Sequence, residues 1–174
     1  MRSGVPPRMD AATTTTPSRA ASSAARPRLL YVVTEDWYFL SHRLPMAHAA
    51  RDAGFEVHLA ANVTNGAAAV AREGFILHAV PFARGKLSPG SIVRTVRALR
   101  RVHREVQPAI VHHVALQASV LGALAARGSK AAFVHAMTGL GFMFTTTGAK
   151  ARTTQRFVLG ILRWLFNRPR HVVL

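Results

Sequence analysis

Residues 34–43, TEDWYFLSHR, hold the densest group of side chains able to do chemistry. Two acids stand near the start of this segment and a Ser-His-Arg triplet ends it. Carboxylates and imidazoles accept protons from hydroxyls, and a guanidinium binds diphosphates through paired hydrogen bonds. We expect the serine to cap a helix whose first amides and dipole help to hold an anion. Asp36 and His42 could therefore take a proton from a hydroxyl, and Glu35, Ser41 and Arg43 could bind a hydroxyl or a diphosphate.

A structural interpretation of the same segment stays open. Trp37, Tyr38 and Phe39 could fill the edge of the domain, and His42 could cap the helix locally. An exposed loop acid needs no catalytic role. The segment also has no glycine, although a glycine-rich turn is what lets backbone amides approach a phosphate closely.

Three histidines near predicted strand ends form a second group of candidates. His112 and His113 are adjacent in a predicted strand, so their side chains point to opposite faces of the sheet. At most one of them faces a ligand, for which we predict His113 as a catalytic group, and a core histidine is the better interpretation of the other. A metal site is not expected, because the two side chains diverge and no Cys or carboxylate cluster accompanies them. His135 is predicted to bind the acceptor or a diphosphate, with a core histidine as the alternative.

A glycine-punctuated loop, 138–142, follows the strand that contains His135. Glycines adopt backbone conformations closed to other residues, so such a loop can approach a ligand. We predict that Thr138, Gly139 and Gly141 contribute to binding, with an ordinary turn as the alternative.

A row of arginines lies on one face of the predicted helix 88–108. Their spacing is 3, 4 and 3 residues, and no acid occurs in the helix before Glu105. The apolar segment 155–166 is flanked by further arginines. An anionic lipid surface suits this combination, with a solvated face as the alternative. Nucleic acid is not expected, because no known motif or interleaved aromatic residues accompany the charge. The predicted membrane-surface residues are Arg94, Arg97, Arg101, Arg104 and Trp164.

The composition limits the classes of protein. The 174 residues fit one domain, and 23 Lys and Arg against 7 Asp and Glu give a net charge of +16, which favours an anionic partner. The absence of cysteine excludes disulfide and thiolate chemistry. No apolar run reaches the roughly 18 residues of a membrane span, and no signal-peptide core is present. We expect a cytoplasmic protein with a disordered basic tail at 1–28, for which a transit peptide is the alternative.

The elements that must position these residues alternate along the chain. Apolar runs predict strands, and 3–4 residue periodicity predicts the helices between them. This order indicates an α/β, Rossmann-like parallel sheet with helices on both faces, whose ligands lie beyond the carboxyl ends of the strands. The last strand ends with the chain, so we expect part of a larger protein. The predicted strands are 28–34, 55–61, 75–82, 109–115, 130–137 and 170–174, and the helices are 41–54, 67–74, 88–108, 117–128 and 155–168.

Three segments resemble the amino-terminal domain of family 4 glycosyltransferases, which have the GT-B architecture of two Rossmann-like domains facing a cleft. They are VVTEDWYFLSHRLPMAHAARDAGFEVHLAA (32–61), IVHHVALQASVLGALAAR (110–127) and VHAMTGLGFMFT (134–145). The resemblance covers residues 29–174. Family members often carry His-x-His in the second segment, and Val114 occupies the second histidine position here.

The resemblance implies an acceptor-binding, membrane-docking half of an enzyme whose carboxy-terminal, donor-binding half is absent from this chain. The whole enzyme would transfer a hexosyl or N-acetylhexosaminyl group from a nucleotide-sugar co-substrate to a lipid-linked or polysaccharide acceptor, without a metal or other cofactor. It would act at the inner face of the cell membrane, and this chain alone would be inactive. The alternatives are a non-catalytic membrane-surface binding module, another GT-B enzyme such as a nucleotide-sugar epimerase, and a basic nucleic-acid binder.

Overall fold

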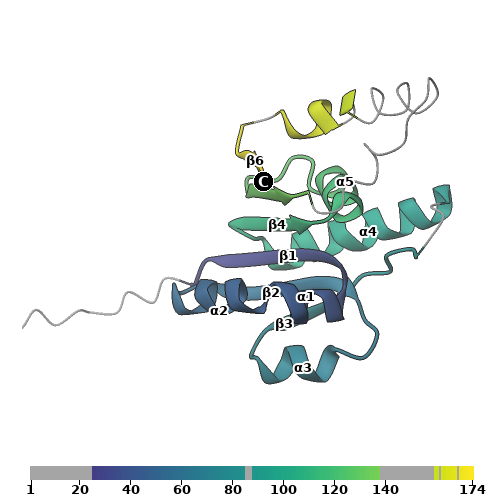
Figure 1. Cartoon of the computed structure of the whole chain (residues 1–174). Coiled ribbons are helices and arrows are strands. Elements are labelled where there is room, and N and C mark those ends of the chain that lie inside the picture. The colour runs from purple at the N-terminus through teal and green to yellow at the C-terminus, as the bar shows by residue number, and fades with distance from the viewer. Residues whose placement is uncertain (1–24, 85–87, 138–158, 161, 168) are drawn as a thin grey trace, which may run out of the picture.

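A computed structural model describes residues 25–84, 88–137, 159–160, 162–167 and 169–174. Strands and helices alternate along the described chain, as Figure 1 shows. The strands are β1 (Arg28–Glu35), β2 (Glu56–Asn62), β3 (Ile76–Ala79), β4 (Ile110–Val114), β5 (Ala132–Ala136) and β6 (His171–Val173). The helices are α1 (Asp36–His42), α2 (Leu44–Asp52), α3 (Ala67–Arg72), α4 (Pro89–Val106) and α5 (Leu116–Ala125), and residues 159–160 and 162–166 are also helical.

The strands form one parallel sheet in the order β3-β2-β1-β4-β5-β6. β1 pairs with β2 on one side and β4 on the other, so the connections that follow β1 and β4 diverge at this point of the sheet. Ligands of doubly wound folds bind at such a switch point, beyond the carboxyl ends of the strands. The predicted α/β, Rossmann-like sheet is confirmed.

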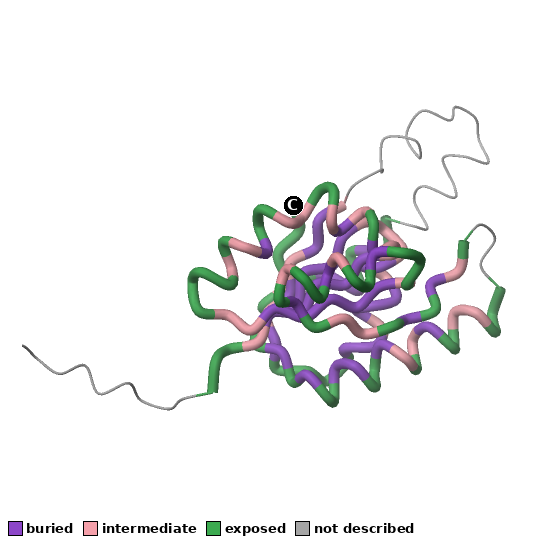
Figure 2. Tube along the Cα trace, turned by 90° about the horizontal axis from the view of Figure 1, so that it is seen from below, coloured by how far each residue is buried: buried purple, intermediate pink, exposed green. Residues whose placement is uncertain are grey.

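Both faces of the sheet are covered by helices. Leu30 and Val32 point toward α4 and α5, whereas Leu29, Tyr31 and Val33 point toward α1, α2 and α3. This alternation follows from the two-residue repeat of a strand. Figure 2 shows the buried residues gathered along the strands and on the inner sides of the helices. The helical residues 162–166 pack on α5, as a third apolar cluster.

Local sequence explains how α4 begins and ends. Ser88 and Ser91 form a reciprocal capping box, and a proline in the first turn needs no amide partner. Leu99 and Val102 are buried against the sheet. The helix ends where Gln107 takes a left-handed conformation with φ 47°, directly before a proline that cannot continue the helix.

The structure corrects two expected boundaries. The helix expected to begin at Ser41 begins at Asp36 and is interrupted at Arg43, where α2 starts with a proline in its first turn. Arg28, which the sequence placed both at the end of the tail and at the start of a strand, lies in β1, and its side chain donates hydrogen bonds to Glu56 Oε1 at 3.1 Å and to the Val106 carbonyl at 2.9 Å. Residues 1–24 of the expected tail lie outside the described part of the chain.

Candidate functional site

Asp36 is buried and holds the start of α1 to the loop after β2. Its carboxylate accepts hydrogen bonds from the amides of Trp37, Thr64 and Gly66, each at 2.8 Å, and from the Thr64 hydroxyl. Burial raises the pKa of Asp36, but these hydrogen bonds outweigh burial and leave it lowered. The side chain is 0% exposed, so the expectation of an exposed loop acid is wrong. Its lone pairs are occupied by these donors, and the catalytic role of Asp36 stays a prediction.

Glu35 marks the carboxyl edge of the sheet. Its two oxygens receive paired hydrogen bonds from Arg84 at 2.8 and 2.7 Å, and Asn62 Nδ2 lies 3.4 Å away. The hydrogen bond from Arg84 is the main reason why the pKa of Glu35 is lowered. The ion pair joins the ends of β1 and β2 to the segment after β3. The sequence predicted ligands beyond the carboxyl ends of the strands but did not single out Asn62 and Arg84, whose only signal was their place after predicted strands.

Aromatic side chains of α1 divide into a buried and an exposed set. Phe39 is fully buried, with its ring 5.3 Å from Tyr31 and 5.9 Å from Phe75. The structural interpretation is therefore right for Phe39. Trp37 is 52% exposed, and the Tyr38 ring stacks on His42 at 4.3 Å. These three side chains leave aromatic surface on the outside of α1.

Ser41 and His42 form a hydrogen-bonded pair in the last turn of α1. Ser41 Oγ lies 2.8 Å from the Trp37 carbonyl and 2.7 Å from His42 Nδ1. The hydroxyl has one proton, and the carbonyl can only accept it. Ser41 Oγ therefore accepts a hydrogen bond from His42 Nδ1–H, which leaves the lone pair on Nε2. Ser41 does not cap a helix start, so that expectation is wrong.

Arg43 turns toward β4 from the junction of α1 and α2. Its Nη1 lies 3.8 Å from the Met46 sulfur, and its Nε is buried with no partner among the residues that the structure describes. His112 shares this face of the sheet, packs on Tyr31 at 5.2 Å and is 5% exposed. Burial, followed by the charge of Arg43, lowers the pKa of His112 to about 4. His112 is therefore the histidine of the adjacent pair that lies on the α1 side.

His113 and His135 lie on the opposite face, beneath α5. His113 Nδ1 lies 3.2 Å from His135 Nδ1, and His135 Nε2 lies 3.0 Å from His171 Nδ1. Both His113 and His135 are 0% exposed. A Cβ atom built on Gly122 of α5 would lie 2.1 Å from His113 Nε2. Burial lowers the pKa of His135 to about 4 and holds the pKa of His113 well below the usual value of a histidine.

Both side chains therefore lie in the core of the domain, the environment that the alternative interpretation gives to a histidine of this sheet. The catalytic role of His113 and the binding role of His135 stay predictions. The predicted binding residues Thr138, Gly139 and Gly141 lie outside the described residues.

The arginines of α4 lie on the side of the helix away from the sheet. They are exposed, while Leu99 and Val102 are buried on the other side. Arg101 pairs with Glu105 at 3.7 Å. Trp164 is 55% exposed, and the guanidinium of Arg127 lies 4.8 Å from its ring. The arginine row comprises Arg94, Arg97, Arg101 and Arg104.

Two searches of the described residues concern metals and membranes. No cluster of three or more His, Cys, Asp or Glu side chains there could hold a metal ion. None of the helices in the described ranges is long and apolar enough to cross a membrane.

The parallel sheet, its strand order and its loops at the carboxyl edge define a Rossmann-like domain, the amino-terminal half of a GT-B fold. The chain belongs to the glycosyl transferase 4-like family, whose model matches residues 28–174. A search of curated proteins finds no significant match.

Solved structures show the same fold at low sequence identity. Acinetobacter baumannii MurG has a TM-score of 0.53 and 15% identity, over 75% of this chain and 39% of that one. Sucrose-phosphate synthase from Thermosynechococcus elongatus has a TM-score of 0.54 and 11% identity. The match covers 81% of this chain and 40% of that one. A UDP-N-acetylglucosamine 2-epimerase has a TM-score of 0.51 and 10% identity. The match covers 80% of this chain and 40% of that one. The chain thus spans about two fifths of the length of these structures.

Proposed function

We propose that the chain is the acceptor-binding domain of a glycosyltransferase. The observation that carries this proposal is the Ser41–His42 pair, which leaves a proton-accepting nitrogen beside exposed aromatic rings in a domain of the glycosyl transferase 4-like family. The enzyme would transfer a hexosyl or N-acetylhexosaminyl group from a nucleotide-sugar to a hydroxyl of a lipid-linked or polysaccharide acceptor. A second domain of the whole protein would bind the nucleotide, so this chain alone would not turn over.

His42 would act as the general base. Its Nε2 takes the proton of the acceptor hydroxyl while that oxygen forms a bond to the anomeric carbon of the donor sugar. The bond from this carbon to the nucleotide diphosphate breaks, and the diphosphate leaves with the electron pair. Ser41 would keep the lone pair of His42 on Nε2 throughout the approach of the acceptor.

The neighbouring side chains supply binding. The exposed ring of Trp37 and the half-buried ring of Tyr38 suit the apolar face of a sugar, with polar groups at the edge to fix its orientation. Arg43, whose Nε has no partner among the described residues, would bind a phosphate of the donor or acceptor, because a guanidinium pairs well with phosphate oxygens. Glu35 would bond an acceptor hydroxyl while Arg84 keeps the carboxylate ionised.

An anionic membrane surface would be the second partner. The arginine row of α4 and the exposed Trp164 combine positive charge with an interfacial aromatic ring, which is the composition of a peripheral membrane contact. The enzyme would then work at the inner face of the cell membrane, where anionic lipids are abundant. Nucleic acid is not proposed as a partner.

The experiment that tests the proposal is a radiolabelled-sugar transfer assay on the full-length enzyme that contains this domain. We expect His42→Gln to lower kcat by about 10²–10⁴-fold, the range for loss of a general base. His48→Gln on α2 is the matched control, because it makes the same chemical change at a side chain paired with Glu73. Unchanged transfer by His42→Gln would contradict the proposal.

An epimerase of the same fold is the second candidate. Its support is the likeness to a solved UDP-N-acetylglucosamine 2-epimerase. Incubation of the full-length enzyme with a nucleotide-sugar and no acceptor separates the candidates. Formation of the epimer would favour this second function, and sugar transfer only on addition of an acceptor would favour the first.

A further inference from the structure

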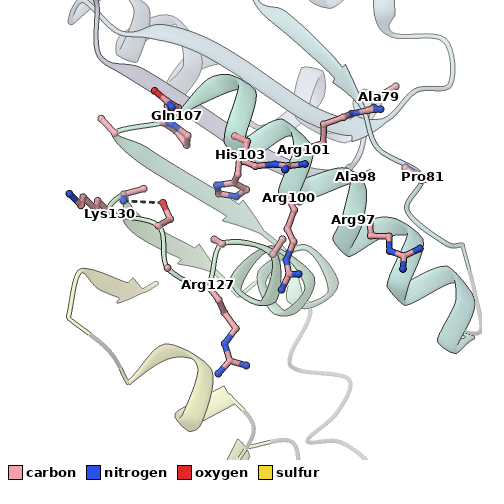
Figure 3. Close-up of a pocket in the computed structure, with 18 residues that line it drawn as sticks. Ala79, Pro81, Arg97, Ala98, Arg100, Arg101, His103, Gln107, Arg127 and Lys130 are labelled. Atoms are coloured by element: carbon pink, nitrogen blue, oxygen red, sulfur yellow. Dashed lines mark hydrogen bonds between the residues drawn. The ribbon is translucent and has the colours of Figure 1, made fainter.

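A wide groove opens at the amino edge of the sheet, away from the candidate site. It lies between the carboxy-terminal half of α4 and the turn that joins α5 to β5, as Figure 3 shows. The segments 107–109 and 127–131, which precede β4 and β5, close its end, and its volume is about 1280 Å³. Most of its lining lies toward the amino edge, but Ala79 and Pro81 extend it to the carboxyl end of β3 on the α4 side of the sheet. The candidate site follows the carboxyl ends of β1 and β2 around α1, on the other face of the sheet.

Two walls of the groove carry basic side chains. One wall is formed by α4 and the other by the turn after α5, which contributes Arg127 and Lys130 (Figure 3). No acidic residue lines the groove. Among the described residues, the ion pair recorded for these arginines is the exposed contact from Arg101 to Glu105. The charge is therefore largely uncompensated and favours an anion between the walls. The arginines of the α4 wall are Arg97, Arg100, Arg101 and Arg104.

Besides the basic residues, the groove is lined mainly by alanine and proline, with Gln107, Ser129 and one histidine as polar residues. His103 points from α4 toward the strands, with its ring centroid 6.5 Å from that of Phe133 (Figure 3). The residue is 8% exposed, and both of its ring nitrogens lack a partner among the described residues. Burial lowers the pKa of His103 to about 4, so the neutral ring keeps one N–H donor. A buried donor without a partner is costly, and an anion that settles in the groove would offer an acceptor.

The surroundings favour a lipid over a soluble anion. Arg127 belongs to the groove and also lies over the ring of Trp164, which is 55% exposed. A smaller hollow lined by Arg127, Trp164 and Arg170 adjoins it. An exposed tryptophan next to basic side chains is typical of residues that sit at the level of lipid headgroups.

We propose that this groove binds the phosphomonoester headgroup of a membrane lipid, with α4 and the Arg127–Lys130 turn contacting the phosphate from opposite sides. The inference rests on the proposed membrane contact and deepens it. The arginine row of α4 would attract any anionic surface, whereas two basic walls select a headgroup that can carry two negative charges.

Vesicle co-sedimentation of the 174-residue chain tests this selectivity. One vesicle set contains phosphatidic acid and the other phosphatidylglycerol, both in phosphatidylcholine and adjusted to the same measured surface potential. We expect binding to the phosphatidic acid set to be at least about five-fold tighter, the gain expected from one additional arginine contact. The double variant Arg100→Gln/Arg127→Gln should abolish this preference.

The matched control removes the same charge outside the groove. The double variant Arg94→Gln/Arg163→Gln should weaken binding to both vesicle sets equally and keep their ratio, because neither residue lines the groove. Equal binding of the unmodified chain to both sets, or no binding to either, would overturn the proposal. So would a groove variant that keeps the preference.

Competition experiments separate the other sources of phosphate. Release of the chain from vesicles by micromolar pyrophosphate would assign the groove to a soluble anion, and release by a short RNA of any sequence would assign it to nucleic acid. Either result overturns the lipid assignment. The His42→Gln transfer assay reports on the other face of the sheet, so loss of lipid preference with normal transfer contradicts only this inference.

Discussion

Ser41 Oγ lies 2.7 Å from His42 Nδ1, and the same oxygen lies 2.8 Å from the Trp37 carbonyl one turn earlier in α1. The helix backbone thus fixes the hydroxyl, and the hydroxyl fixes the tautomer of the imidazole. In serine hydrolases a carboxylate has this orienting role, whereas here a neutral serine would have it. The pair is formed by adjacent residues, so it needs no contact from another element.

Ser41→Ala should lower kcat for sugar transfer in the full-length enzyme by roughly 10-fold while changing KM little, because the acceptor still binds and only the orientation of the base is lost. Ser41→Thr keeps the hydroxyl and should restore most of the rate. Steady-state kinetics with varied acceptor would measure both constants. A loss of equal size in the Thr variant would mean that Ser41 acts through helix packing instead.

Asp36→Asn should destabilise the domain by about 2–4 kcal/mol, because an amide cannot accept as many hydrogen bonds from the donors around it and presents donors of its own. Thr64 and Gly66 would lose the contacts that hold the loop after β2. Urea denaturation followed by circular dichroism measures the change. Asp52→Asn is the control, since the Asp52 side chain is 69% exposed and its substitution should change stability by less than about 0.5 kcal/mol.

Gly122→Ala should destabilise the domain, because the added methyl group would lie 2.1 Å from His113 Nε2 inside a packed core. Overpacking of this kind costs about 1–3 kcal/mol. Gly90→Ala in the first turn of α4 is the control, where a Cβ atom meets nothing within 4 Å.

A double-mutant cycle identifies the contact responsible for this effect. The combination of Gly122→Ala with His113→Ala should cost less than the sum of the two single changes, because the smaller side chain makes room for the methyl group. Strict additivity of the two free energies would show that His113 is not the neighbour that limits residue 122.

Much of the fold follows from the sequence, but the roles of several site residues do not. The alternation of Leu29 to Val33 places successive side chains on opposite faces, and the apolar repeat of α4 fixes which side its arginines occupy. The same two-residue repeat separates His112 from His113, yet it does not say which face belongs to the site. That depends on how α5 packs against the sheet.

Contacts between distant segments are what the sequence leaves out. Asp36 is satisfied by donors 28 and 30 residues away, and Glu35 pairs with a side chain 49 residues away. Their partners sit in loops without a characteristic pattern, so local reasoning treats both acids as available. The early start of α1 has the same origin, because Phe39 is drawn into the core by Tyr31 and Phe75.

Acid should destabilise the domain well before its carboxylates titrate. The pKa values of His103, His112 and His135 are each lowered to about 4 by burial, against 6.5 for an unperturbed histidine. The unfolded chain binds protons at these histidines first, so stability is greatest above pH 6.5 and falls as the pH drops toward 4. Below about pH 4 the folded state is protonated too, and this contribution changes no further. One unit of pKa difference corresponds to about 1.4 kcal/mol, so the three together amount to several kcal/mol.

Urea midpoints measured at pH 8, 6, 5 and 4 should therefore decline between pH 6.5 and 4. His103→Phe should flatten part of the decline, because it removes one titrating group while keeping an aromatic ring against Phe133. Asp36 cannot produce this slope, because its pKa is lowered below the usual aspartate value of 3.8, so its contribution fades only below that pH. A midpoint that stays constant from pH 7 to 5 would contradict the burial of neutral histidines in this core.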